Sequence, residues 1–180
     1  MRIITGSARG RRLEAPEGLD TRPTAEHVKE AVFSIIQFQV PECVFADIFA
    51  GSGQMGMEAL SRGAEKAIFI ENDKKAGDVI RRNLAAARFE DRGRLIPSDF
   101  RMAIPLLPEI DIAFLDPPYK QELLLPALEL LVPKMSRRGI ILCEASKWES
   151  LPETLPGFPL RKVYTYSKTT ITAYRRADEE

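Results

Sequence analysis

An aspartate, two prolines and a tyrosine stand together as Asp116-Pro117-Pro118-Tyr119 at the end of an apolar run. A carboxylate and a backbone carbonyl placed in this way can accept the two N–H hydrogens of a planar amine. Successive prolines hold that carbonyl in one direction, because each ring locks φ. The tyrosine ring offers a face for stacking a base. The motif therefore indicates chemistry on an exocyclic amine, with Asp116, Pro117 and Tyr119 as catalytic residues and Pro118 as a substrate contact. A proline turn capped by aspartate is the alternative.

A glycine-rich segment follows an earlier apolar run that ends at Asp47. It consists of Ala50, Gly51, Ser52 and Gly53. Glycines after a strand allow a ligand to approach the backbone closely, and the next helix presents free N–H groups. Glu71 stands twenty residues beyond Gly51, where a carboxylate can accept the hydroxyl protons of a ribose. Together these features predict a nucleoside cofactor, whereas a structural turn is the alternative. Gly51, Gly53 and Gly56 also match the spacing of NAD sites.

Apolar runs and segments of helical periodicity alternate over most of the chain, and this alternation must position both motifs. Strands are predicted at 43–49, 67–71, 94–97, 110–115 and 139–144, with helices at 25–38, 55–62, 73–88 and 122–132. This alternation predicts an α/β fold with a doubly wound, Rossmann-like parallel sheet. Segments 160–166 and 169–175 are predicted to form an antiparallel hairpin at its edge.

The length of 180 residues favours one domain, since domains usually span roughly 100–200 residues. We divide this domain into a basic N-terminal hairpin, residues 1–23, and a core, residues 24–180. The hairpin is a small extension of the sheet domain.

The formal net charge is zero, with 26 basic and 26 acidic residues, but the basic residues gather at the two ends. Residues 1–12 contain four arginines and no acid, and residues 161–176 contain five basic residues and no acid. We expect Arg9, Arg11 and Arg12 to contact RNA phosphates. A balanced total charge argues against general RNA scavenging and favours a shaped, partly protein-covered target.

Some kinds of chemistry are disfavoured by composition. His27 is the only histidine, and the two cysteines, Cys43 and Cys143, lie far apart in apolar stretches. We therefore expect no metal, no Ser-His-Asp hydrolysis, and two reduced core thiols. No apolar run approaches the roughly 20 residues that span a bilayer, and no secretory signal is visible. These features predict a cytoplasmic protein without a membrane partner.

The run Asp47-Ile-Phe-Ala-Gly-Ser-Gly53 resembles the first motif of class I S-adenosylmethionine-dependent methyltransferases. The resemblance implies S-adenosylmethionine as cofactor, with the glycine loop and Asp47 at its amino-acid end. It also implies that Asp99 meets the adenine amino group, that Asn72 and Phe100 belong to the same site, and that the sheet order is 3-2-1-4-5-7-6 with the last strand antiparallel. Asp116-Pro117-Pro118-Tyr119 is similar to the signature of amino methyltransferases.

Nearly the whole chain resembles the RsmD-type methyltransferases, which modify guanine N2 in bacterial 16S ribosomal RNA. The specific part of the resemblance is the basic start, then Arg22-Pro23-Thr24, then Val28-Lys-Glu-Ala-Val-Phe33. It implies that Arg22 and Thr24 lie near the mouth of the active site. The implied partner is 16S rRNA within a small-subunit assembly particle, and we expect a monomer.

Four alternative functions explain different parts of the sequence. A DNA adenine-N6 methyltransferase normally carries an additional target-recognition region, and a release-factor glutamine methyltransferase normally has Asn before the prolines and a helical N-terminal domain. An NAD oxidoreductase explains the glycines and Glu71 but gives Asp116-Pro117-Pro118-Tyr119 no task. A non-catalytic RNA-binding protein keeps the basic arm and has no need of Asp116.

Overall fold

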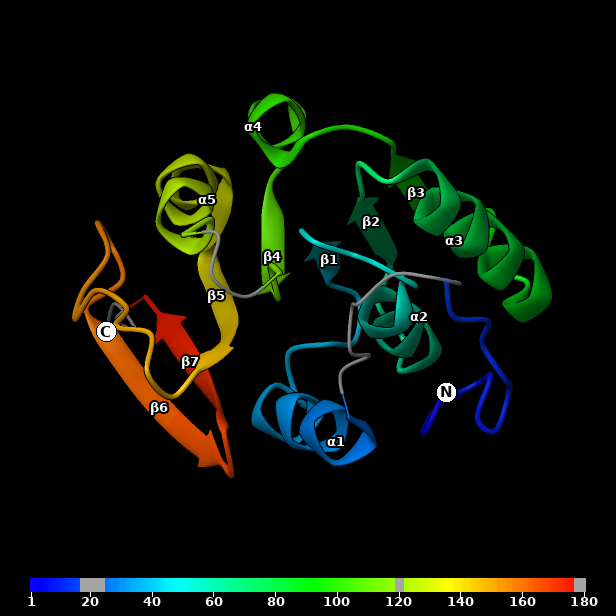
Figure 1. The fold of residues 1–180 in the computed structure, drawn as a ribbon, viewed down its shortest axis with the longest axis horizontal. Helices are drawn as coiled ribbons and strands as arrows, with labels where there is room; N and C mark the ends of the chain where they lie inside the picture. The colour runs from blue at the N-terminus through cyan, green and yellow to red at the C-terminus, as the bar shows by residue number, and fades with distance from the viewer. Residues whose placement is uncertain (17–24, 119–121, 177–180) are drawn as a thin grey trace.

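The computed structural model describes residues 1–16, 25–118 and 122–176. Within them, a single twisted sheet has the order β3-β2-β1-β4-β5-β7-β6 (Figure 1). The strands are β1 (Val44–Asp47), β2 (Lys66–Ile70), β3 (Gly93–Ile96), β4 (Ile110–Leu115), β5 (Met135–Ser146), β6 (Leu160–Tyr166) and β7 (Thr169–Arg175). Strands β1 to β5 pair in parallel, and β7 is antiparallel to both of its neighbours. The predicted fold class, strand order and reversed last strand are confirmed.

Helices cover both faces of the sheet (Figure 1). They are α1 (Glu26–Ile35), α2 (Gln54–Ser61), α3 (Lys74–Ala87), α4 (Phe100–Ala103) and α5 (Leu124–Leu131), with the short 3-10 turns η1 (Ile104–Leu106) and η2 (Val132–Lys134). Apolar residues of α1, α2 and α3 form one core cluster with the sheet, and those of α4, η1 and α5 form the other. Two separate apolar layers therefore hold the sheet, as expected for a doubly wound fold.

Strand residues alternate between these two layers. In β1, Phe45 packs with the α1 side and Ala46 with the α4 side, and in β4 Phe114 and Leu115 divide in the same way. The alternation follows from the period of two along a strand. Because both faces are buried there, the central strands β1, β2 and β4 consist mostly of apolar residues.

Helix α3 shows how local chemistry sets the bounds of an element. Its N-cap, Asp73, accepts the backbone N–H of Ala76 at 2.8 Å, and its C-cap, Arg88, has a φ of 60°. The predicted helix 73–88 therefore includes both caps of the observed helix.

The structure differs from the predicted elements at three places. Helix α1 ends at Ile35, short of residue 38, and α4 has no periodic signal because it consists of four residues. Strand β5 begins at Met135, earlier than residue 139, and its register against β4 shifts between Ile110 and Ile112. This irregularity accommodates three additional residues in β5 between the two pairs, a feature that apolar periodicity alone does not show.

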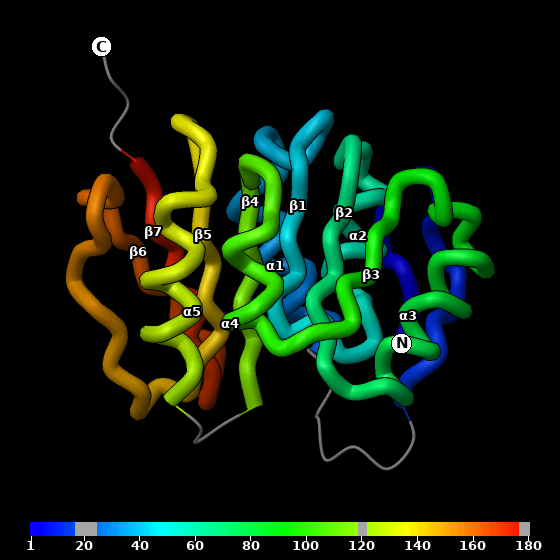
Figure 2. The backbone as a smooth tube through the Cα atoms, turned by 90° about the horizontal axis from the view of Figure 1, so that it is seen from above, coloured from blue at the N-terminus to red at the C-terminus, as the bar shows by residue number. Residues whose placement is uncertain are grey.

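The N-terminal segment forms a hairpin closed by a bridge between Arg2 and Arg12. Its anchor is Glu58, a fully buried acid of α2, which accepts the backbone N–H groups of Ile4 and Thr5 at 2.8 and 3.0 Å. Figure 2 shows this hairpin beside α2 and α3, away from α4 and α5. The hairpin therefore packs on the domain at one side of the sheet.

Among the described residues, no helix combines the length and apolarity needed to cross a bilayer.

Candidate functional site

Acidic side chains stand at the carboxyl ends of three neighbouring strands of the sheet. Asp47 is the last residue of β1, Glu71 follows β2 and Asp116 follows β4. Because parallel strands end at the same edge of a sheet, these three residues lie at the edge where α/β proteins bind ligands.

Asp47 supports the first turn of α2, directly after the glycine loop. The residue is 2% exposed, and its carboxylate accepts the backbone N–H of Gly56 at 3.1 Å. Burial is the main cause that raises the pKa of Asp47 to about 8; the bond from Gly56 opposes the rise, and the nearby charges of Asp116 and Glu71 contribute to it. Asp47 is therefore a buried residue whose hydrogen bond to Gly56 is internal to the protein.

The glycines of the loop have different structural tasks. Gly51 has a φ of +54°, and a Cβ placed on it would meet nothing within 4 Å. Gly53 has a φ of +78°, and a Cβ on Gly53 or Gly56 would crowd the ring of Phe69. Gly51 therefore leaves open space beside the loop, whereas Gly53 and Gly56 allow close packing of α2 on β2.

Glu71 connects the ends of β1 and β2. Its Oε2 accepts the backbone N–H of Gly51 at 2.8 Å, and its Oε1 accepts that of Asp73 at 2.8 Å. A carboxylate has about four acceptor positions, so two backbone bonds leave capacity for hydroxyl donors. Glu71 is thus held in place before any ligand binds.

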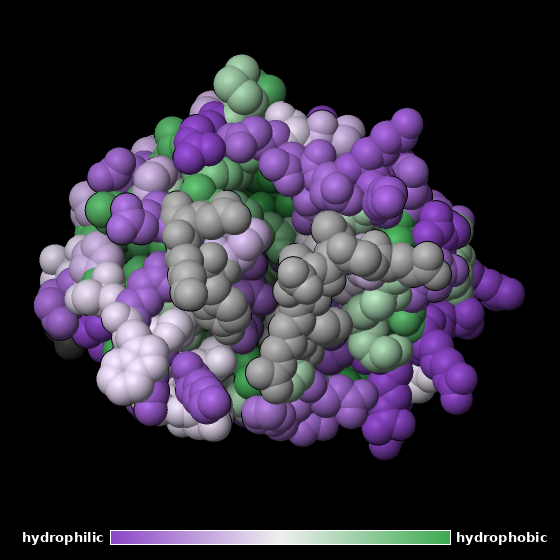
Figure 3. Space-filling view, in the orientation of Figure 1, coloured by the Kyte–Doolittle hydropathy of each residue, from purple (hydrophilic) through white to green (hydrophobic). Residues whose placement is uncertain are grey.

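A cavity of about 320 Å³ opens beside Glu71. It is lined by Ile48, Phe49, Ile70, Glu71, Asn72, Ser98, Asp99, Phe100, Arg101, Pro118 and Leu123. Figure 3 shows a hollow with apolar colouring near the middle of the face that it draws. The rings of Phe49 and Phe100 lie 5.2 Å apart at an angle of 58°. The cavity therefore combines aromatic faces with carboxylates, which suits a nucleoside.

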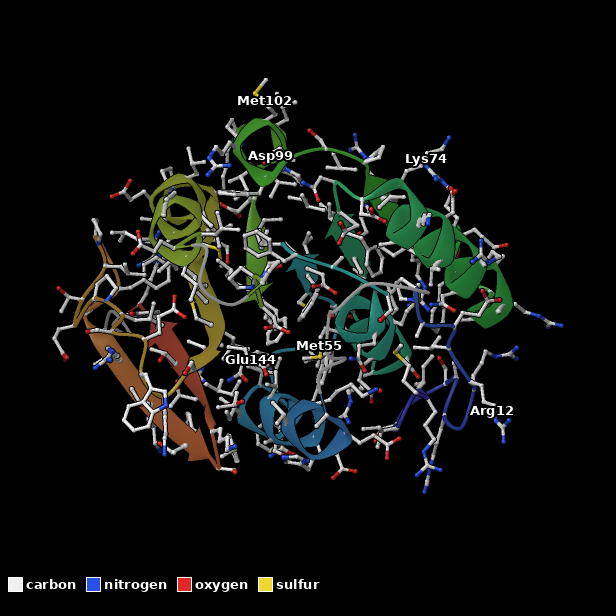
Figure 4. All side chains as sticks on the ribbon, viewed as in Figure 1. Arg12, Met55, Lys74, Asp99, Met102 and Glu144 are labelled. Carbon is white, nitrogen blue, oxygen red and sulfur yellow. The ribbon has the colours of Figure 1, made fainter. Side chains whose placement is uncertain are left out.

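Asp99, labelled in Figure 4, has a structural task as well as a place in this cavity. It is the N-cap of α4 and accepts the backbone N–H of Arg101 at 2.8 Å. The guanidinium of Arg101 also lies 3.3 Å from its other oxygen and 4.5 Å from the Phe100 ring centre. These contacts fix Asp99 and Phe100 relative to one another.

The structure brings together some of the residues predicted from sequence but not others. Glu71, Asn72, Asp99, Phe100 and Pro118 line the cavity, and Gly51 is bonded to Glu71.

Other predicted residues lie outside the cavity lining. These are Asp47, Ala50, Ser52, Gly53, Asp116 and Pro117. Asp116 is half-buried and Pro117 is buried. Tyr119, Arg22 and Thr24 lie outside the described residues.

The predicted RNA-binding arginines lie apart from this cavity. Arg9, Arg11 and Arg12 are exposed on the N-terminal hairpin. The hairpin contacts α2 through Ala8 N–H, which donates to Ser61 Oγ at 3.0 Å, and α3 through Glu14 N–H, which donates to Asn83 Oδ1 at 2.8 Å.

Sequence reasoning missed several residues that build the site and its surroundings. The apolar wall formed by Ile48, Phe49 and Leu123 gives no chemical signal, although Phe49 directly precedes the glycine loop. Lys29 is buried on α1, where its ammonium donates to the carbonyl of Arg2 at 2.7 Å, and burial lowers its pKa. Glu58 could have been found from sequence, because it is the one charged residue in the helix 54–61.

No group of three or more His, Cys, Asp or Glu side chains among the described residues could hold a metal ion. His27 is exposed. Both cysteines are buried free thiols, and burial raises the pKa of Cys43 to about 12 and raises that of Cys143 as well. Low thiolate content makes both of them poor nucleophiles.

The strand order, the glycine loop and the acids that follow β1, β2 and β4 define a class I methyltransferase fold. The family model described as "Conserved hypothetical protein 95" matches residues 1–175, and the chain belongs to this family of RsmD-type methyltransferases.

Relatives match the chain over nearly its full length. It is 35% identical over 182 residues to the Bacillus subtilis protein YlbH, covering 98% of this chain and 99% of that one. It is 30% identical over 182 residues to the Escherichia coli K12 protein named ribosomal RNA small subunit methyltransferase D, covering 98% and 90%. The solved structure of Escherichia coli yhhF is similar with a TM-score of 0.88 and 30% identity, covering 99% of each chain.

Proposed function

We propose that this protein transfers a methyl group from S-adenosylmethionine to the exocyclic N2 amine of a guanine in 16S ribosomal RNA. The observation that carries the proposal is the position of Asp116-Pro117-Pro118, whose last proline lines the same cavity as Glu71 and Asp99. An amine-binding motif and a nucleoside-sized cavity thereby share one edge of the sheet. The names of the relatives in Escherichia coli and Haemophilus influenzae, ribosomal RNA small subunit methyltransferase D, support RNA of the small subunit as the substrate.

The cofactor site is the cavity together with the glycine loop. In this proposal Glu71 accepts the ribose hydroxyls, Asp99 accepts the adenine amine, and Asn72 and Phe100 contact the adenosine. Ala50, Gly51, Ser52 and Gly53 face the amino-acid end, where the open side of Gly51 admits the ligand. Asp47 acts by holding the first turn of α2 behind this loop, or through water, since it is nearly inaccessible. When bound, S-adenosylmethionine supplies an electrophilic methyl group on sulfur.

Asp116 and Pro117 act on the target amine. The Asp116 carboxylate and the Pro117 carbonyl accept its two N–H hydrogens, which draws the nitrogen lone pair out of conjugation with the ring. The nitrogen then forms a bond to the methyl carbon while the carbon–sulfur bond breaks, and its excess proton leaves to Asp116. Tyr119 provides a stacking face for the base, and Pro118 contacts it. Orientation of the two reactants supplies most of the rate acceleration.

The N-terminal hairpin supplies RNA contacts outside the cavity. Arg9, Arg11 and Arg12 are exposed there and free to meet phosphates, and Arg22 and Thr24 are proposed to lie nearer the reacting base. We further propose a single domain that acts as a cytoplasmic monomer without a metal, on RNA within a small-subunit assembly particle.

The test is methyl transfer from labelled S-adenosylmethionine to small subunits or 16S RNA that lack the modification, followed by nucleoside analysis. We expect N2-methylguanosine from the wild type and a strong loss with Asp116→Ala. Detection of N6-methyladenosine would favour an adenine methyltransferase. Tighter calorimetric binding of NAD than of S-adenosylmethionine would favour an oxidoreductase. RNA binding without transfer, equal in wild type and Asp116→Ala, would indicate a non-catalytic RNA-binding protein.

A further inference from the structure

A second acidic side chain, Glu144 of β5, lies next to the proposed amine-binding residue. Strands β4 and β5 are parallel, and their last paired residues are Leu115 and Cys143. The next residue on each strand is Asp116 and Glu144, respectively. Since paired strands lie about 4.8 Å apart, the two acids are neighbours at the carboxyl edge of the sheet.

Both acids point to the α1 side of the sheet. On β5, Leu142 packs with the apolar cluster of α1 and α2, whereas Cys143 packs with the cluster of α5. Alternation along the strand therefore directs Glu144 to the same side as Leu142. Figure 4 agrees, since it shows the labelled Glu144 between β5 and α1.

The same reasoning applies to Asp116. Phe114 packs with the α1 cluster and Leu115 with the opposite cluster, so the next residue, Asp116, turns to the α1 side. The electrostatic effect of Asp116 on Asp47 supports this placement, because Asp47 follows Phe45 on that side of β1.

Glu144 is also deeply placed, with only 6% of its surface exposed. Acidic side chains are rarely this buried in proteins unless they are paired. Enzymes read a base that is turned out of its stack inside a closed pocket, where a buried acceptor at the end of the sheet can contribute to recognition. The proposed amine chemistry uses Asp116 and gives Glu144 no part.

The hydrogen-bonding pattern of guanine explains two adjacent acids. Its Watson–Crick edge presents two neighbouring donors, N1–H and the N2 amine, whereas adenine presents an N1 lone pair beside its N6 amine. An ionised carboxylate can only accept hydrogen bonds. A pair of carboxylates therefore suits guanine. When adenine enters, one carboxylate faces the N1 lone pair, and these two acceptors repel each other.

We propose that Glu144 accepts the N1–H of the target guanine and thereby selects guanine over bases whose N1 carries a lone pair. This inference rests on the proposed methylation of guanine N2. Asp116 binds the reacting amine, and Glu144 is the specificity-determining residue beside it. A site that is built to bond a polar group rejects analogues that lack it, because its buried partner is left unpaired.

The test compares guanine with 2-aminopurine at the mapped target position of a synthetic RNA, assembled with small-subunit proteins where the naked RNA is not methylated. 2-Aminopurine retains the exocyclic amine at C2 but carries a lone pair at N1. We expect the wild type to prefer guanine in kcat/KM by on the order of 100-fold. In Glu144→Gln this preference should shrink at least about tenfold, because an amide can accept from N1–H or donate to the N1 lone pair.

Controls separate recognition from folding. Glu149→Gln removes one negative charge from the exposed segment after β5 and should keep the wild-type preference. Glu144→Asp keeps the charge and should lower kcat/KM while retaining the preference. The thermal midpoint and S-adenosylmethionine binding of each variant report on its folding. 2-Aminopurine also lacks O6, which affects every enzyme variant. The informative quantity is therefore the guanine preference of each variant divided by that of the wild type, because the effect of the missing O6 cancels in this ratio.

Each failure has its own signature. If the wild type forms no N2-methylguanosine, the proposed function is wrong. If it forms N2-methylguanosine but uses guanine and 2-aminopurine equally, the role of Glu144 is wrong whatever the variants do. The same conclusion follows if Glu144→Gln and Glu149→Gln both keep the full preference.

Discussion

The backbone N–H of Gly51 donates to Glu71 Oε2 at 2.8 Å and thereby joins the loop after β1 to the end of β2. The other oxygen of Glu71 accepts the N–H of Asp73, the N-cap of α3. One carboxylate thus orients the glycine loop and the start of the next helix. In the proposed cofactor site this arrangement is preorganised, so little reordering opposes binding.

Replacing Glu71 tests this arrangement. Glu71→Gln places an amide N–H₂ against one of two backbone donors, so we expect S-adenosylmethionine affinity to fall by about 10- to 100-fold. Isothermal titration measures the change. Glu65→Gln, which alters an exposed acid just before β2, is the control and should bind like the wild type. Unchanged affinity of Glu71→Gln would exclude Glu71 from the cofactor site.

Asp116 should affect transfer more than cofactor binding. We expect Asp116→Asn to lower kcat by roughly 10²- to 10³-fold, since an amide carries no negative charge and cannot take up the excess proton of the reacting amine. Affinity for S-adenosylmethionine should stay within about threefold, since Asp116 does not line the cavity. Single-turnover methyl transfer and titration measure the two effects. Glu109→Gln, at the opposite end of β4 and exposed, is the matched control. Equal transfer by Asp116→Asn and wild type would refute the proposed amine contact.

Asp47 predicts a pH dependence of stability. Its pKa is about 8 in the folded protein and near 4 when unfolded, so between these values the folded state holds a proton that the unfolded state has released. Stability from this group is therefore present below about pH 4 and is lost as pH rises through about 8.

Asp47→Asn removes this titration and retains an oxygen that can accept from Gly56. We expect the thermal midpoint of Asp47→Asn minus that of the wild type to be higher at pH 8.5 than at pH 5. The corresponding difference in the free energy of unfolding changes by at most about 1.4 kcal/mol per pH unit. Thermal unfolding at both pH values measures the difference. For the exposed Asp91→Asn, the difference in thermal midpoint from the wild type should be the same at both pH values. A pH-independent difference for Asp47→Asn as well would contradict the raised pKa.

The N-terminal arginines predict a salt effect on RNA binding. Replacing Arg9, Arg11 and Arg12 with alanine should weaken binding and reduce the slope of log affinity against log salt by roughly 0.7–0.9 per lost phosphate contact. Binding to 16S RNA at several salt concentrations measures the slope. A control that replaces the exposed Lys66, Arg94 and Arg138 removes equal charge elsewhere. Equal slopes in the hairpin variant and the wild type would remove the hairpin from the RNA interface.

We expect the N-terminal hairpin to depend on Glu58 for its attachment to the domain. Its carboxylate accepts from Ile4 N–H, Thr5 N–H and the Arg62 side chain, the last at 2.8 Å. Glu58→Gln leaves a donor facing an amide N–H₂, so we expect a loss of about 2–4 kcal/mol in the free energy of unfolding.

Denaturant unfolding and limited trypsin cleavage at the hairpin arginines measure this effect. The exposed Glu65→Gln should change neither. Cleavage of Glu58→Gln at the wild-type rate would show that Glu58 does not hold the hairpin.

Much of the fold could be predicted because its signals are local. The continuous apolar residues of β1 and β4 indicate strands buried on both faces, and the caps at Asp73 and Arg88 explain the ends of α3 within a residue. Helix α4 and the shifted register of β5 could not be predicted in this way, since four residues carry no period and register depends on the partner strand.

The candidate site divides along the same line. Gly51, Glu71 and Asp116 were identified from sequence because each combines a telling residue type with a place just after an apolar run. The wall formed by Phe49 and Leu123 was not, because apolar residues that line a cavity have the same composition as those that fill a core.

By itself, the sequence determined the order of elements, the class of sheet and the residue types available at the strand ends, since periodicity and turn chemistry act over a few residues. Only the tertiary structure decided that Glu58 supports the N-terminal hairpin and that Glu144 lies beside Asp116. Both relationships join residues from different elements, so they depend on strand pairing and burial across the whole domain. Which backbone groups a buried acid binds depends on its neighbours, and these are known only once the chain has folded.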